Sequence, residues 1–131
     1  MPRHRRILVA DSSKYFHNSI WYRLIPDTEF EIIGQAGTTA EIVSMATNLS
    51  PDIVLVDLSH PDHCGLHTVM ALHAIQPRVP IVTLMPILSN EYTRASLDAG
   101  AAACLSKSDL ATLLLPTLRN LISVQAAVRV N

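Results

Sequence analysis

The chain has 131 residues and a mass of 14.4 kDa, the size of one domain with a single core. Ten Lys and Arg residues oppose eleven Asp and Glu residues, so the net charge of −1 excludes the basic footprint of a dedicated nucleic-acid binder. Hydrophobic residues make up 49% and charged residues 16%, which excludes a disordered chain, and the apolar runs are too short to cross a bilayer. Two cysteines and the absence of an apolar signal segment after Met1 predict a cytoplasmic setting.

Short apolar runs alternate five times with longer amphipathic stretches along the chain. Strands that are buried on both faces read as continuous apolar runs, and helical crossovers join parallel strands. The pattern therefore predicts an α/β fold with a parallel sheet. The expected strands are residues 6–10, 31–36, 52–56, 80–85 and 101–105, and the expected helices are residues 13–25, 39–49, 66–75, 91–99 and 109–123.

Local signals mark several ends of the expected helices. Thr38 and Glu41 have the spacing of a capping box, in which a hydroxyl and a carboxylate serve the orphan amides of a helix start. Gly100 is placed to end the fourth helix, and Ser108 to cap the last one. Pro116 interrupts the last helix, which predicts either a kink or a late helix start.

Three charged residues follow strands of the predicted sheet. Asp11 follows the first strand directly, Asp57 follows the third, and Lys107 comes two residues after the fifth. The carboxyl ends of parallel strands meet at one edge, so the three side chains are expected to share a pocket. Two carboxylates, a divalent metal and a lysine form an arrangement suited to phosphoryl transfer, with an aspartate as the nucleophile. Taken singly, each aspartate after a strand reads equally well as a turn former.

The motifs around these residues resemble a response-regulator receiver domain of two-component signalling. They read ILVADSS, DIVLVDLSHPDHCGL, VPIVTLMP and DAGAAACLSK, and together they extend over most of the chain. The stretch SPDIVLVDL and the AGA before the lysine resemble in particular the NarL/FixJ (LuxR-type) transcriptional regulators. The resemblance implies a flavodoxin-like, doubly wound (βα)5 fold with strand order 2-1-3-4-5. It divides the chain into a basic tail (1–5), a receiver domain (6–123), and a C-terminal tail or start of a linker (124–131).

The resemblance also implies roles for individual residues. Asp57 would be the phosphoacceptor and Lys107 the phosphoryl contact. Mg²⁺ would be held by Asp11, Asp57 and the backbone carbonyl of Ser59. The expected partners are a sensor histidine kinase or a small phosphodonor, and a second copy in a homodimer. DNA would be reached only through a domain that is not in this chain, and no membrane contact or enzymatic activity is expected beyond self-catalysed phosphotransfer to Asp57.

Three positions depart from the family pattern. Ser12 replaces the second acid after the first strand, so Mg²⁺ binding should be weakened. Met85 replaces the Ser or Thr that hydrogen-bonds the phosphoryl group, and Cys104 replaces the switch aromatic residue. A hydrogen bond to a charged group contributes about 1.5–3 kcal/mol, comparable to the gap between two switch states. Thr83 is an alternative hydroxyl, although it lies two residues upstream, inside the predicted strand.

These departures predict a receiver whose phosphorylation-driven switching is atypical and which regulates transcription through dimerisation or an output domain. The alternative is a phosphate-independent pseudo-receiver that serves as a protein–protein interaction module. A third class is an enzyme or small-ligand binder that uses the same sheet edge. Separately, the loop from His60 to His67 holds several residue types that bind transition metals, although a solvent-exposed loop explains the same residues.

Overall fold

The computed structural model describes residues 4–11, 29–58 and 65–130, and the helix expected at 13–25 lies outside them. Each expected strand and the four other expected helices are present. The strands are β1 (Arg5–Ala10), β2 (Phe30–Ala36), β3 (Ile53–Asp57), β4 (Ile81–Met85) and β5 (Ala103–Ser106). The helices are α2 (Thr39–Leu49), α3 (Gly65–Ile75), α4 (Asn90–Ala99), the short 3₁₀ helix η1 (Lys107–Asp109) and α5 (Leu110–Val130).

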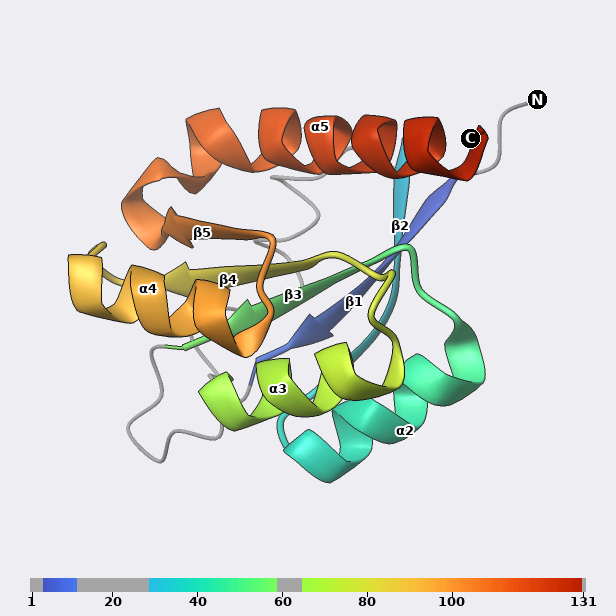
Figure 1. The fold of residues 1–131 in the computed structure, drawn as a ribbon, viewed down its shortest axis with the longest axis horizontal. Coiled ribbons are helices and arrows are strands. Elements are labelled where there is room, and N and C mark those ends of the chain that lie inside the picture. Colours follow the sequence, from blue (N-terminus) through green and yellow to red (C-terminus); the bar gives the residue numbers. More distant parts are fainter. Residues whose placement is uncertain (1–3, 12–28, 59–64, 131) are drawn as a thin grey trace.

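The five strands form one sheet in the order β2-β1-β3-β4-β5, and every neighbouring pair is parallel. Figure 1 shows α5 over one face of this sheet and α2 and α3 over the opposite face. The order reverses between β1 and β3, which is where ligands bind in doubly wound sheets. The predicted fold class and strand order are confirmed.

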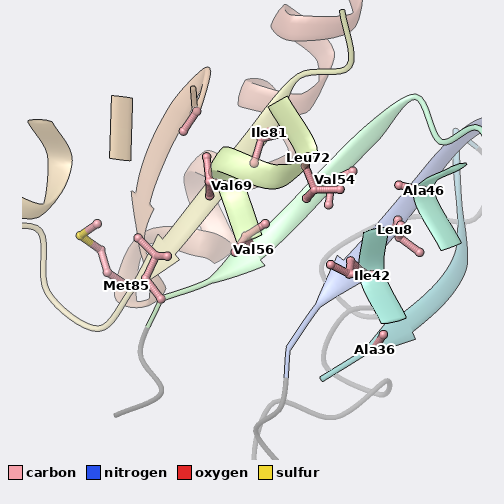
Figure 2. Close-up of a cluster of buried hydrophobic side chains, with 12 residues drawn as sticks. Leu8, Ala36, Ile42, Ala46, Val54, Val56, Val69, Leu72, Ile81 and Met85 are labelled. Carbon is pink, nitrogen blue, oxygen red and sulfur yellow. The ribbon is translucent and has the colours of Figure 1, made fainter. Parts of the chain in front are cut away.

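Alternate residues of each inner strand enter two separate hydrophobic clusters, because successive side chains of a strand point to opposite faces. One cluster joins strand residues such as Val9 and Leu55 to Leu114 of α5. The other joins Leu8 and Val54 to side chains of α2 and α3, as Figure 2 shows. Burial on both faces explains why these strands read as unbroken apolar runs in the sequence. Both clusters hold the carboxyl ends of the central strands in fixed positions.

Helix α2 begins as predicted. The Thr38 hydroxyl accepts a hydrogen bond from the Glu41 amide and donates one to the Glu41 carboxylate. Gly100 ends α4 with a φ of 121°, where a side-chain carbon would lie 2.5 Å from the His73 ring. Glycine is therefore required at residue 100, both for the backbone angle and for the space.

The last helix differs from the prediction in three respects. Ser108 does not cap α5, because it lies inside the short helix η1 that precedes α5, and the N-cap of η1 is Ser106. Pro116 lies inside α5, so the late helix start is wrong. The helix also continues past Ser123 to Val130, since no Gly or Pro interrupts the sequence there. Among the helices described, none combines the length and the apolar character that a membrane span requires.

Candidate functional site

Asp11 and Asp57 stand side by side at the carboxyl edge of the sheet. Asp57 is the last residue of β3, and Asp11 follows β1 directly. The pairing of Ala10 with Val56 makes the next two residues, Asp11 and Asp57, neighbours across the β1–β3 ladder. The Asp11 amide donates to the Ala36 carbonyl at 3.0 Å, which continues the β1–β2 ladder and fixes the backbone of Asp11. Both aspartates are buried, with exposed fractions of 6% and 9%.

Lys107 reaches Asp57 from the end of β5, the edge strand of the sheet. It is the first residue of η1, directly after β5. Its Nζ donates to Oδ2 of Asp57 at 2.9 Å, and the two side chains are 20% and 3% exposed. A buried carboxylate is tolerated when a paired and hydrogen-bonded charge stands beside it. The structure therefore brings Asp57 and Lys107 into direct contact, although fifty residues separate them in the chain.

The strand that lies between β3 and β5 contributes no charged group to this edge. Met85, the last residue of β4, is 3% exposed and belongs to the cluster that α2 and α3 cover. Figure 2 shows it at the end of β4, in the same cluster as Val56 and Val69. A thioether cannot donate a hydrogen bond. Residue 85, where the family pattern has a Ser or Thr that hydrogen-bonds the phosphoryl group, is therefore part of the hydrophobic core.

Thr83 is fully buried, and its hydroxyl has several partners on neighbouring elements. It is 2.6 Å from the Ser96 hydroxyl of α4, 2.8 Å from Sγ of Cys104 on β5, and 3.4 Å from the Ala103 carbonyl. These bonds join β4, α4 and β5 beneath the surface. Thr83 therefore ties helix α4 to the sheet, in agreement with its expected place inside the strand.

Ser106 is a functional candidate that the sequence reasoning did not single out. It ends β5, lies opposite Met85 in the β4–β5 ladder, and is 6% exposed. Its hydroxyl donates to the Pro86 carbonyl at 3.1 Å, accepts from the Ser108 amide at 3.3 Å, and lies 2.8 Å from the Ser108 hydroxyl. The sequence signal that could have pointed to Ser106 is a serine directly before Lys107, at the start of the turn that carries the lysine.

Several predicted site residues fall outside the described part of the chain. They are Ser12, Ser59 and the loop residues His60–Cys64. His67, the remaining candidate of that loop, is exposed at the first turn of α3. Among residues 4–11, 29–58 and 65–130, no group of three or more His, Cys, Asp or Glu side chains is arranged to hold a metal ion. The two carboxylates that stand directly at strand ends on this edge are those of Asp11 and Asp57.

A second ion pair lies away from this edge. Nε of Arg119 on α5 donates to Oε2 of Glu29 at 2.8 Å, and the Arg119 NH2 group donates to the other oxygen. The hydrogen bonds from Arg119 lower the pKa of Glu29 and raise the pKa of Arg119. Both side chains are largely exposed, so solvent screens the pair.

Known proteins resemble this chain in both sequence and structure. It is 26% identical over 114 residues to the uncharacterised transcriptional regulatory protein YxjL of Bacillus subtilis, a match that covers 87% of this chain and 52% of that protein. It is 34% identical over 103 residues to a protein-glutamate methylesterase/protein-glutamine glutaminase of Rhizobium etli, covering 78% of this chain and 30% of the enzyme. The chain therefore spans about half or less of the length of these relatives.

Among solved structures, a LuxR-family two-component response regulator from Aurantimonas has a TM-score of 0.79 to this chain. The match covers 98% of this chain and all of that one, and the sequence identity of 21% makes it evidence of shared fold alone. The protein-family model described as "Response regulator receiver domain" matches residues 7–117 of this sequence, which include Asp11, Asp57 and Lys107. The chain belongs to the response-regulator receiver domain family.

Proposed function

We propose that this chain receives a phosphoryl group on Asp57 in a two-component signalling system and that its switching is atypical. The observation that carries the proposal is the 2.9 Å contact between Lys107 Nζ and Asp57 Oδ2, at a buried sheet edge that also holds Asp11. A lysine that already contacts the nucleophilic carboxylate is placed to neutralise charge on an incoming phosphoryl group. Family membership supports the same role.

The chemistry assigned to Asp57 is one displacement at phosphorus. An oxygen of the Asp57 carboxylate attacks the phosphorus of the donor, and a phosphorus–oxygen bond to the aspartate forms. The donor's phosphorus–nitrogen bond breaks if it is a phosphohistidine, and its phosphorus–oxygen bond breaks if it is an acyl phosphate. The bonding electrons leave with the donor, and Lys107 balances charge on the transferred oxygens. The chain is therefore a phosphoryl acceptor rather than an enzyme with a turnover substrate.

Mg²⁺ is the expected cofactor at this edge. It is held in proteins by oxygen ligands, commonly one or two carboxylates together with waters and phosphate oxygens. Asp11 and Asp57 are adjacent carboxylates and fit that donor set, and the backbone carbonyl of Ser59 is a third ligand by resemblance. When bound, Mg²⁺ would stabilise negative charge on the phosphoryl oxygens. Ser12 in place of a second acid predicts weaker binding than a receiver with both acids would have.

The output is proposed to be regulation of transcription in the cytoplasm, through homodimerisation or through a DNA-binding domain outside this chain. The transcriptional regulator among the relatives supports this. The phosphodonor would be a sensor histidine kinase or a small acyl phosphate. Phosphorylation is proposed to have a weaker effect on α4 than in a receiver with a hydroxyl at residue 85, because Met85 offers no donor and Thr83 already bonds Ser96.

The test is incubation with Mg²⁺ and acetyl phosphate, read by intact mass. The wild type should gain the mass of one phosphoryl group. Asp57→Asn is the matched control, because it keeps the shape of the side chain while removing the nucleophile. Beryllofluoride, which mimics the phosphoryl group without a chemical step, should bind the wild type and not the variant, as read by ¹⁹F NMR.

The second candidate function is a phosphate-independent interaction module. This candidate is favoured by Met85, which is buried at the position where the family pattern has a phosphoryl-bonding hydroxyl. This candidate predicts no mass gain with acetyl phosphate and no bound beryllofluoride at millimolar concentrations of both reagents. An equal mass gain in Asp57→Asn would instead assign the modification to another residue and overturn the role of Asp57. Turnover of an added substrate would be needed to support an enzyme.

A further inference from the structure

The hydroxyl of Ser106 uses all of its hydrogen-bonding capacity. A serine hydroxyl has one proton to donate and two lone pairs to accept with. The Pro86 carbonyl can only accept and the Ser108 amide can only donate, so the single proton of Ser106 goes to Pro86. The Ser108 hydroxyl, 2.8 Å away, must then be a donor to Ser106. The Ser106 hydroxyl is therefore held by three hydrogen bonds, one to Pro86 and two from Ser108, in a site that is almost closed to water.

These bonds join two segments that meet the candidate phosphorylation site from different strands. On one side, Ser106 caps the turn of η1 that carries Lys107, the residue in contact with Asp57. On the other side, it holds the backbone of Pro86, the first residue after β4. The hydroxyl-bearing side chain that would join Asp57 to this loop directly is missing, because residue 85 is methionine. The connection through Ser106 bypasses residue 85.

We infer that Ser106 is a positioning residue that couples Lys107 to the loop between β4 and α4. A change at Asp57 that moves the ammonium of Lys107 displaces the η1 turn, and Ser106 passes that displacement to the carbonyl of Pro86. The inference rests on the proposed function only where phosphate supplies the change. The coupling between Lys107 and the loop is a property of the unmodified chain and is testable without phosphate.

Because α4 is fixed to the sheet, a displacement passed on by Ser106 is confined to the loop between β4 and α4. The Thr83 hydroxyl bonds Ser96 in the middle of α4 at 2.6 Å, so the helix is tied to the sheet independently of Ser106. The loop residues before the helix are exposed, and Ile87 exposes 81% of its surface. Ser106 therefore controls the presentation of Ile87 and Leu88, while α4 keeps its place.

The experiment compares backbone amide shifts of Ile87 and Leu88 in variants of the unmodified chain. Lys107→Met removes the charge and keeps the aliphatic stem. In the wild-type background it should change the chemical shifts of both amides. In the Ser106→Ala background the shift changes of Ile87 and Leu88 should be no larger than those of the amides in α2, which serve as a reference away from the site. Ser108→Ala is the matched control, because it removes one bond to Ser106 and leaves the bond to Pro86, so the loop response should persist.

Two outcomes would overturn the inference. The first is a loop response to Lys107→Met that is equally large in Ser106→Ala, and the second is no loop response in the wild-type background. Ser106→Cys nearly keeps the side-chain volume but donates weakly. It should reduce the response in the same way, and it replaces Ser106→Ala if that variant does not fold.

Beryllofluoride gives a second arm, with ¹⁹F NMR as an independent measure of whether it has bound. In molecules that carry the mimic, the loop amides should shift in the wild type and in Ser108→Ala, but not in Ser106→Ala. Bound mimic with equal loop shifts in all three proteins contradicts the inference while leaving the proposed function intact. Absence of bound mimic contradicts the proposed function, and the Lys107→Met comparison still decides the role of Ser106.

Discussion

The candidate site has two halves, one at the ends of β1, β3 and β5 and the other at the end of β4. They differ in whether they carry the residue types of the family pattern. At the ends of β1, β3 and β5, the charged residues Asp11, Asp57 and Lys107 are present, and two of them are in direct contact. At the end of β4, the corresponding position is the buried Met85, and the nearest hydroxyl on that strand, Thr83, is bonded to Ser96 and Cys104. The groups that would accept a phosphoryl group are therefore separable from those that would respond to it. Acceptance of a phosphoryl group and the response of the β4–α4 loop can therefore be measured one at a time.

The largest expected effect concerns the charged half. Lys107→Met should slow modification of Asp57 by acetyl phosphate about 100-fold, because it removes the cation that faces the developing charge. The measurement is the rate of mass gain at fixed Mg²⁺ and acetyl phosphate. Arg119→Met is the matched control, since it removes a cation that pairs with Glu29 away from the site. Equal rates in the two variants would contradict the role given to Lys107.

The next effect concerns Met85 in the other half. Met85→Thr removes buried volume and introduces a hydroxyl, so it should lower the free energy of unfolding by about 2–3 kcal/mol. Met85→Leu conserves volume and should cost less than about 1.5 kcal/mol. Urea unfolding measures both variants. If Met85→Thr is as stable as Met85→Leu, the side chain is not packed as the structure places it, and the contrast between the two halves weakens.

A smaller effect is expected at Thr83. Thr83→Val keeps the shape but leaves the hydroxyl of Ser96 without that partner in a fully buried site, which should cost about 1–3 kcal/mol. The double variant Thr83→Val, Ser96→Ala should be no less stable than Thr83→Val alone, because both partners are then apolar. Thr112→Val, at an exposed hydroxyl of α5, is the control. Additive losses in the double variant would show that the two hydroxyls do not form the inferred bond.

The smallest effect lies outside both halves, at Glu29 and Arg119. The hydrogen bonds from Arg119 lower the pKa of Glu29 from its ordinary value of 4.5, so the pair stabilises the fold above that pH. This contribution is lost as the pH falls through the folded-state pKa of Glu29. Glu29→Gln should therefore unfold at a slightly lower urea concentration than the wild type at about pH 7, and this difference should shrink as the pH falls through the folded-state pKa of Glu29. High salt should also reduce the difference, and a difference that persists under acid would contradict the ion pair.

The fold and the charged edge could be predicted because both depend on local patterns. Runs such as 52–56 are apolar throughout since both faces of β3 are buried, and that property can be read from the residues themselves. The end of a strand follows from where the run stops, so Asp57 could be placed at the sheet edge to within one residue. The roles assigned to Asp57, Lys107 and Asp11 came from resemblance and stay predictions until the phosphorylation experiment is done.

Only the tertiary structure decided which polar group each buried hydroxyl meets. Ser106 and Pro86 are twenty residues apart, and Thr83 and Ser96 are thirteen apart, so no periodicity in the sequence pairs them. Their bonds depend on the β4–β5 register and on where α4 packs against the sheet. The cap at Ser106 was missed for the same reason, because η1 forms where the chain turns from β5 toward α5. Sequence patterns fix which face of an element is buried, whereas packing fixes which polar groups share that burial.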